Sequence, residues 1–304
     1  MTPAAIPDRL RRRMLSYVNL YCNTRCNSRC ITCDFWKMDP LPRLTAADVA
    51  SVAASRFADE DTWFAVQGGE FSLHPEADAI LELFEDRHYI LFTNFLSAER
   101  VVGLVRRHRT PYVAVSLDGG REGYARIRGV DAFDRVTRSI LRLRAEAEIS
   151  VGFTLTPWSE LADYEAVAAF CRGNGIEFGV NLYTDSQIYQ ATTPPAHYPF
   201  LASIVADSQD AFAAAYEPWR EGRLALPCHS IREVASVAPD GTVHLCHNQT
   251  AALGNVKDAG FDAVWDSEHA RALHDRYASC NACWTSCYRT FDLKRARVVD
   301  GAPA

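Results

Sequence analysis

Short apolar runs alternate with amphipathic stretches between residues 14 and 183, and this alternation constrains the fold more than any other feature of the sequence. The apolar runs have strand length, and the stretches between them carry apolar residues at helical spacing. Strands that alternate with helices in this way form a parallel sheet with the helices outside it. Six such units are too few for a complete eight-unit barrel, so the sequence predicts an α/β fold, a partial (β/α)6 barrel. The predicted strands are 15–21, 63–67, 89–93, 112–117, 149–155 and 178–182, and the predicted helices are 46–56, 75–86, 98–107, 133–146 and 160–172.

The remainder of the chain has a different composition. The Pro- and Thr-rich segment 190–199 predicts a linker, and residues 200–216 predict a helix. Asp240-Gly241, which lies between two apolar runs, is a strong signal for a β-hairpin. We therefore predict a barrel domain over residues 1–190, a helical linker over 191–227, and a small C-terminal domain of hairpin and helix over 228–304.

Ten cysteines are unusual for a chain of 304 residues. The N-terminus lacks the apolar core of a signal peptide, and no run of about 20 apolar residues is available to span a membrane. We therefore expect a cytoplasmic protein, whose thiols stay reduced or bind metal. Four cysteines lie within 22–33 and five within 228–287. Cys22 and Cys171 are expected to be buried and inert.

The first group contains three closely spaced cysteines, Cys26, Cys30 and Cys33, directly after the first predicted strand. Three thiolates within eight residues can bind three corners of a four-iron cluster and leave the fourth iron open. A zinc site is the alternative, but structural zinc prefers four ligands, often in two pairs. The loop also lies at the carboxyl end of a strand, where α/β folds place their chemistry.

This C-x3-C-x2-C loop, after the first strand of a partial barrel, resembles the radical S-adenosylmethionine (SAM) superfamily. The resemblance implies that the open iron of a [4Fe-4S] cluster binds the amino and carboxylate groups of SAM. One electron then cleaves SAM to a 5′-deoxyadenosyl radical, which abstracts a hydrogen atom. Many members have an aromatic residue before the third cysteine. This chain has Thr32 there, so Phe35 or Trp36 is the alternative source of adenine stacking.

Further residues at strand ends are similar to SAM contacts in that superfamily. Gly68-Gly69-Glu70 follows the second strand, and the resemblance implies that this segment, with its carboxylate, holds the amino group of SAM. Arg128 is expected to reach the carboxylate of SAM, with a loop-to-helix ion pair as the alternative. Asn181 is expected to face the cavity or to cap its strand. The implied cofactor-binding set is Thr32, Gly68, Gly69, Glu70, Asn94, Ser116 and Arg128.

The second cysteine group resembles the twitch domain, a shortened SPASM domain that binds one auxiliary [4Fe-4S] cluster. The matching pattern is C-x12-G-x4-C followed by C-x2-C, and a zinc ribbon is the alternative. Five cysteines surround a cluster that needs four. The twitch pattern selects Cys228, Cys246, Cys280 and Cys283 and leaves Cys287 free. The compact run Cys280, Cys283 and Cys287, together with Cys228, leaves Cys246 free instead. We predict that Cys246 is the free thiol and a catalytic hydrogen donor, and that the ligands are Cys228, Cys280, Cys283 and Cys287.

A free thiol beside a radical can return hydrogen to carbon and invert a stereocentre. The extra cysteine, the size and the negative charge of the chain make it most similar to the aminoglycoside (neomycin) epimerases. The butirosin-type aminocyclitol dehydrogenases are the second candidate, and peptide-modifying maturases are the third. The net charge of −6 suits a cationic sugar and disfavours nucleic acid. We expect a flavodoxin or ferredoxin as electron donor. A zinc protein or a simple electron carrier is the non-catalytic alternative. Candidate substrate contacts are Asp118, Glu122, Asp185, Glu233, Trp158 and Tyr183.

Overall fold

The computed structural model describes residues 8–184, 186 and 198–299, and within them the strands form one nine-stranded sheet. The strand order is β6-β5-β4-β3-β2-β1-β7-β8-β9. Strands β1 to β6 and β7 run parallel, whereas β8 is antiparallel to β7 and β9. The strands are β1 (Tyr17–Tyr21), β2 (Trp63–Gln67), β3 (His88–Thr93), β4 (Tyr112–Ser116), β5 (Glu148–Leu155), β6 (Glu177–Leu182), β7 (Val234–Val237), β8 (Thr242–His244) and β9 (Ala252–Asn255).

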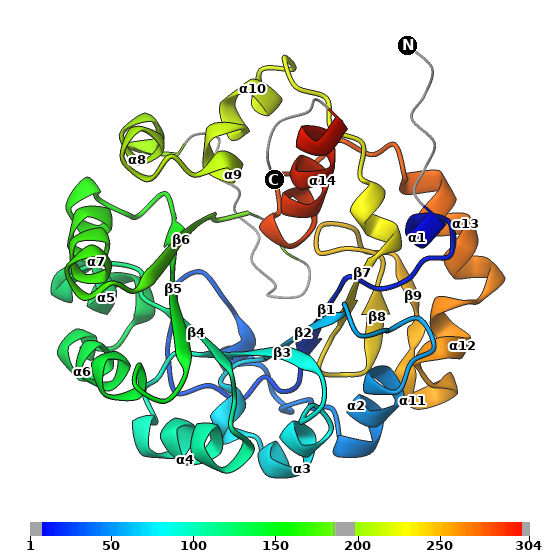
Figure 1. Ribbon diagram of the computed structural model, residues 1–304, viewed down its shortest axis with the longest axis horizontal. Helices are drawn as coiled ribbons and strands as arrows, with labels where there is room; N and C mark the ends of the chain where they lie inside the picture. The colour runs from blue at the N-terminus through cyan, green and yellow to red at the C-terminus, as the bar shows by residue number, and fades with distance from the viewer. Residues whose placement is uncertain (1–7, 185, 187–197, 300–304) are drawn as a thin grey trace.

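The sheet curves around a central space, and the helices of the first part lie along its outer side (Figure 1). This is the partial barrel that the strand–helix alternation predicts, and the six strands predicted for it are confirmed. Burial along β5 alternates as expected for such a wall. Val151, Phe153 and Leu155 are buried, whereas Thr154 points inward and lines a cavity. The helices of this part are α1 (Asp8–Arg11), α2 (Ala46–Ala53), α3 (Ala77–Glu82), α4 (Ala98–His108), α5 (Arg121–Arg128), α6 (Phe133–Leu143) and α7 (Leu161–Asn174).

The helix ends follow local chemistry. Thr45 and Asp48 form a capping box at the start of α2, with hydrogen bonds of 3.2 Å and 2.8 Å. Gly175, with φ of +62°, ends α7 in the left-handed conformation that glycine adopts easily. Ser97 precedes α4 but does not cap it with its side chain. Its hydroxyl instead accepts a 3.0 Å hydrogen bond from Asn27 in the loop after β1.

The predicted helix over 200–216 is broken into shorter pieces. Gln209 has a φ of +52° and ends the first piece, and Asp210 then caps the next with a 2.7 Å bond to the amide of Ala213. The predicted hairpin is confirmed, with Gly241 at φ +95° in its turn. Asp185 and most of the predicted linker 190–199 lie outside the described residues. The helices of this part are α8 (Leu201–Ser208), α9 (Ala211–Ala214), α10 (Tyr216–Arg220), α11 (Val256–Ala259), α12 (Phe261–Trp265), α13 (Glu268–Tyr277) and α14 (Ser286–Val299).

The C-terminal part is continuous with the barrel. Strand β7 pairs with β1 in register from Tyr17↔Val234 to Leu20↔Val237, so the hairpin extends the same sheet. Helix α14 packs against α9 and the 3₁₀ turn His229–Arg232, and it lies on the side where the barrel is open (Figure 1). Within the described residues, no helix combines the length and the apolarity required to cross a membrane.

Candidate functional site

A cavity of about 280 Å³ opens at the carboxyl ends of the barrel strands. One part of its wall is the loop after β1, and further parts are the ends of β2 to β6. The C-terminal part adds His247, Thr285, Ser286 and Cys287. The cavity is therefore built jointly by the barrel and by its C-terminal extension.

The loop that carries Cys26, Cys30 and Cys33 is fixed by the end of α5. The amides of Arg29 and Ile31 donate to the carbonyl oxygens of Arg128 and Ile127, both at 3.0 Å. The last carbonyl groups of a helix have no partner within the helix. The amides of the loop bond to these carbonyl groups of α5, and these hydrogen bonds hold the loop in its conformation. All three cysteines line the cavity as a result.

The thiols of this loop fit a metal cluster. Burial raises the pKa of Cys26 to about 11 and that of Cys33 to about 12, so the metal-free thiols hold their protons, and metal must displace them. Three thiols from one loop line the same cavity, and three ligands suit three corners of a four-iron cluster, whereas structural zinc prefers four.

Gly68 and Gly69 line the cavity and are packed directly against the loop after β1. A Cβ atom at Gly68 would lie 2.4 Å from Asn23 Oδ1 and 2.6 Å from its backbone oxygen. A Cβ atom at Gly69 would lie 2.5 Å from the backbone oxygen of Thr24. The glycines are required because any side chain there would push the cysteine loop away.

Glu70 does not line the cavity, unlike the two glycines that precede it. Its carboxylate is buried and accepts hydrogen bonds from the amide and hydroxyl of Ser72, the hydroxyl of Thr93 and the amide of Asn94, at 2.6–3.2 Å. Burial raises the pKa of Glu70, although these bonds favour the charged form. The carboxylate therefore joins β2 to the end of β3, and binding of an ammonium group by the Gly68-Gly69-Glu70 segment stays a prediction.

The other predicted cofactor contacts, Thr32, Asn94, Ser116 and Arg128, all line the cavity. Arg128 Nε lies 2.6 Å from Asp118 Oδ2, so the predicted alternative of an ion pair is present. Its Nη1 also donates to Cys30 Sγ at 3.5 Å. Burial disfavours the charged form, but Asp118 and Cys30 outweigh it and raise the pKa of Arg128.

Aromatic side chains lie beside the cysteine loop. Phe35 and Trp36, the predicted alternatives for adenine stacking, line the cavity. Trp36 Nε1 donates to the carbonyl oxygen of Cys30 at 3.1 Å. The guanidinium carbon of Arg29 lies 5.2 Å from the Trp36 ring centroid.

The second cysteine group is arranged differently from the prediction. Cys228, Cys246, Cys280 and Cys283 line a separate cavity of about 50 Å³. Cys287 instead lines the large cavity together with the first cysteine group. The exchange arises because Cys287 is the second residue of α14, whose first turn directs it toward the barrel interior while the neighbouring Tyr288 lines the small cavity. The predicted positions of Cys246 and Cys287 are thus reversed.

His247 was not recognised from the sequence. Its ring Nδ1 lies 3.2 Å from Cys287 Sγ, and its Nε2 lies 3.0 Å from Ser236 Oγ and 3.1 Å from the Tyr21 hydroxyl. The ring is fully buried, and burial lowers the pKa of His247 to about 3, so the imidazole is neutral. Its position directly after Cys246 was the one signal that could have identified it.

The predicted substrate contacts are only partly in place. Asp118 and Tyr183 line the cavity, and Trp158 packs against Tyr183 with ring centroids 5.7 Å apart. Glu122 is exposed on α5. Glu233 is wrong as a contact, because it precedes β7 at the other end of the barrel and bonds Ser16 Oγ at 2.8 Å.

Two family models match the sequence. The Radical SAM superfamily model matches residues 20–170, and the SPASM model, an iron-sulfur cluster-binding domain, matches residues 228–288. No curated protein matches the chain significantly.

Solved structures share the fold. SuiB from Streptococcus suis bound to S-adenosylmethionine aligns with a TM-score of 0.66 at 14% identity, over 86% of this chain and 68% of SuiB. SuiB bound to precursor peptide SuiA aligns with a TM-score of 0.67 at 15% identity, over 88% of this chain and 69% of SuiB. Native anSMEcpe with bound AdoMet and Cp18Cys peptide gives 0.59 at 18% identity, over 85% and 82% of the two chains.

The fold and the two cysteine groups define an α/β barrel enzyme with an iron–sulfur extension. The chain contains a radical SAM domain over residues 20–170 and a C-terminal SPASM domain over residues 228–288. The cofactors of such an enzyme are [4Fe-4S] clusters and SAM. The sulfur-lined cavities described above fit these clusters.

Proposed function

We propose that this enzyme epimerises a carbon of a small polar substrate and that Cys287 is the hydrogen donor. The observation that carries the proposal is that Cys287 lines the same cavity as Cys26, Cys30 and Cys33 but comes from α14. When bound, the cluster and SAM supply a radical that removes a hydrogen atom from the substrate. A thiol on a different part of the wall can return hydrogen from another direction, which inversion requires.

His247 orients this thiol. When Tyr21 donates to Nε2, the ring proton lies on Nδ1 and points toward the Cys287 sulfur. The S–H hydrogen is then left to face the cavity. Ser236 on β7 holds the same Nε2, so the ring is fixed by two strands of the barrel. The sulfur regains its hydrogen afterwards as one electron and one proton, with the electron coming from an external carrier.

The cavity wall favours a neutral, hydroxyl-rich substrate group such as a sugar ring. Its described lining is rich in hydroxyl and amide side chains, and within it the carboxylate of Asp118 is already paired with Arg128. A sugar, including the ring of an aminoglycoside, matches these hydrogen-bonding groups. The amino groups of a cationic sugar would need carboxylate partners outside this described lining.

The test is a deuterium experiment with matched serine variants. An epimerase that uses a thiol places one deuterium on the inverted carbon in heavy water, and the substrate panel consists of aminoglycosides. Cys287→Ser should keep about eight irons per chain and still cleave SAM, but lose inversion. Cys246→Ser should lose about four irons. Loss of iron in Cys287→Ser and not in Cys246→Ser would refute the reassignment.

Dehydrogenation is the second candidate, favoured by one observation. The neighbouring residues Cys287 and Tyr288 line the large and the small cavity respectively, so the first turn of α14 forms part of both walls and is a short way between them. An electron can pass this short way from substrate to an auxiliary cluster. A ketone product without deuterium in the same experiment identifies this reaction. Modification of a peptide is the remaining alternative, supported only by fold, since SuiB and anSMEcpe have been solved with peptides.

A further inference from the structure

A positively charged groove lies outside the cavity, between α4 and α6. It measures about 570 Å³, and we call it the arginine groove. The structure gives Arg142 an ion pair with Glu99 at 2.6 Å, and Arg100 bonds the backbone oxygen of Ser72 at 2.9 Å. No ion pair is recorded for Arg100, Arg135 or Arg138 among the described residues, and all three side chains are exposed. The charged residues that line the groove are Arg100, Arg135, Arg138, Arg142 and Glu99.

The arginine groove directly adjoins the loop of the first cysteine group. Ser97 forms part of its wall, and its hydroxyl accepts the 3.0 Å bond from Asn27. Asn27 follows Cys26 in sequence, and Asn94 links both, with Nδ2 2.9 Å from Asn27 Oδ1 and 3.6 Å from Cys26 Sγ. One residue therefore separates the wall of the groove from the first cysteine.

The outer side of the same loop carries features of an interaction surface. Ile31 lies between the second and third cysteines and is 45% exposed. Arg29, two residues earlier, is also exposed. An exposed apolar side chain among arginines is typical of protein interfaces, in which arginine is enriched and aspartate and glutamate are depleted.

We infer that the arginine groove, together with Arg29 and Ile31, is the docking surface for an acidic one-electron carrier protein of the flavodoxin or ferredoxin kind. This inference rests on the radical chemistry proposed above, which consumes an electron from outside. The whole chain has a net charge of −6 and repels an acidic partner in general. A local excess of positive charge beside the cysteine loop attracts such a partner to the place where the electron is used.

The transfer is simple to balance. The reduced carrier loses one electron, and the group held by Cys26, Cys30 and Cys33 gains it; no bond forms and no proton moves at the docking surface. Docking here leaves Cys287 and the C-terminal wall of the cavity untouched, since the groove is lined by residues 96–142 of the barrel.

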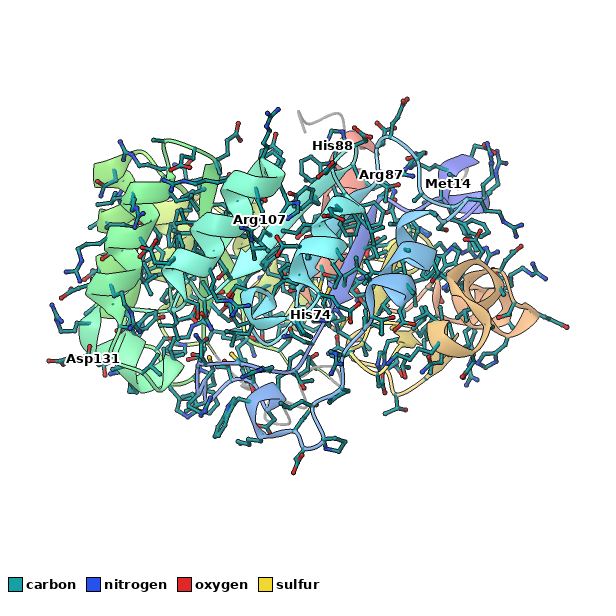
Figure 2. All side chains as sticks on the ribbon, turned by 90° about the horizontal axis from the view of Figure 1, so that it is seen from below. Met14, His74, Arg87, His88, Arg107 and Asp131 are labelled. Atoms are coloured by element: carbon teal, nitrogen blue, oxygen red, sulfur yellow. The ribbon has the colours of Figure 1, made fainter. Side chains whose placement is uncertain are left out.

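The experiment compares two reductants. The double variant Arg135→Glu/Arg138→Glu makes two charge reversals in the groove, and Arg87→Glu, a single charge reversal outside the groove, is the control. Arg87 lies just before β3, at the end of the barrel away from Asp131 (Figure 2). SAM cleavage is measured with dithionite, which does not dock, and with reduced flavodoxin. Binding of fluorescently labelled oxidised flavodoxin to the cluster-loaded enzyme is measured separately by anisotropy, and an acidic ferredoxin serves as the second probe.

The double variant should weaken flavodoxin binding about tenfold or more, since two attractive contacts become repulsive, and should keep the dithionite rate. The control should match the wild type in both assays. An equal loss with dithionite, unchanged carrier binding, or a wild type that binds neither carrier overturns the inference. If dithionite fails to support SAM cleavage in the wild type, the radical chemistry fails, while the binding assay still tests the surface.

Discussion

Replacing Gly68 by alanine tests whether the glycine pair sets the position of the cysteine loop. The new Cβ would lie 2.4 Å from Asn23 Oδ1, 2.6 Å from Asn23 O and 2.9 Å from Asn23 N. Two of these three atoms belong to the backbone, so rotation of the Asn23 side chain cannot relieve the clash. Overpacking of this kind costs about 1–3 kcal/mol, and we expect the upper half of this range. Cys26 is three residues beyond Asn23 and must move with it.

Two measurements follow this change. Urea unfolding of the metal-free protein should show a lower midpoint with an unchanged slope. Iron content after anaerobic reconstitution should fall by about four irons per chain, because the first cluster is disturbed while the small cavity is distant in sequence.

The matched control is Gly173→Ala. Gly173 lies within α7, and nothing is within 4 Å of the position of its Cβ. Alanine is preferred to glycine inside a helix, so this variant should be more stable by about 0.5–1 kcal/mol. The reasoning is refuted if Gly68→Ala keeps both the urea midpoint and the full iron content.

Three further predictions concern buried polar groups. Asp118→Asn removes the partner of the buried Arg128 and should destabilise the protein by about 3–5 kcal/mol in urea unfolding, whereas Asp134→Asn, an exposed pair, should change stability by less than about 1 kcal/mol. Since burial raises the pKa of Glu70, the folded protein keeps a proton there that the unfolded chain loses above about pH 4.5, so this residue makes stability fall as pH rises through its pKa. Glu70→Gln should remove that part of the slope, seen in urea midpoints across the pH range, and an unaltered slope would contradict the assignment. His247→Gln should lower the ratio of inverted product to cleaved SAM without reducing cleavage itself; a parallel loss of both would mean that His247 supports the site as a whole.

The sequence predicted the barrel well because its signals are local. Alternating burial along β5 and the capping box at Thr45 depend on neighbours within a few residues. The C-x3-C-x2-C loop was likewise readable, since three ligands within one loop need no knowledge of the rest of the fold.

Other features depend on how distant segments meet, and the sequence alone did not reveal them. Cys246 and Cys287 are both close to the auxiliary ligands in sequence, and only the direction of the first turn of α14 decides which of them faces the large cavity. The hydrogen bonds that Glu70 accepts from Ser72 and Asn94 also depend on the folded structure, and the sequence did not show them. The pairing of β7 with β1 is also nonlocal, and it brings His247 to the site.

That pairing has a consequence for dissecting the molecule. A fragment that stops before residue 234 would leave the amide and carbonyl groups of Tyr17 to Leu20 bare along one side. An unpaired strand edge of this kind can pair with the strands of other chains, and this promotes aggregation. The hairpin therefore protects the outer edge of β1, and neither the barrel nor the C-terminal part is suited to study as a separate fragment.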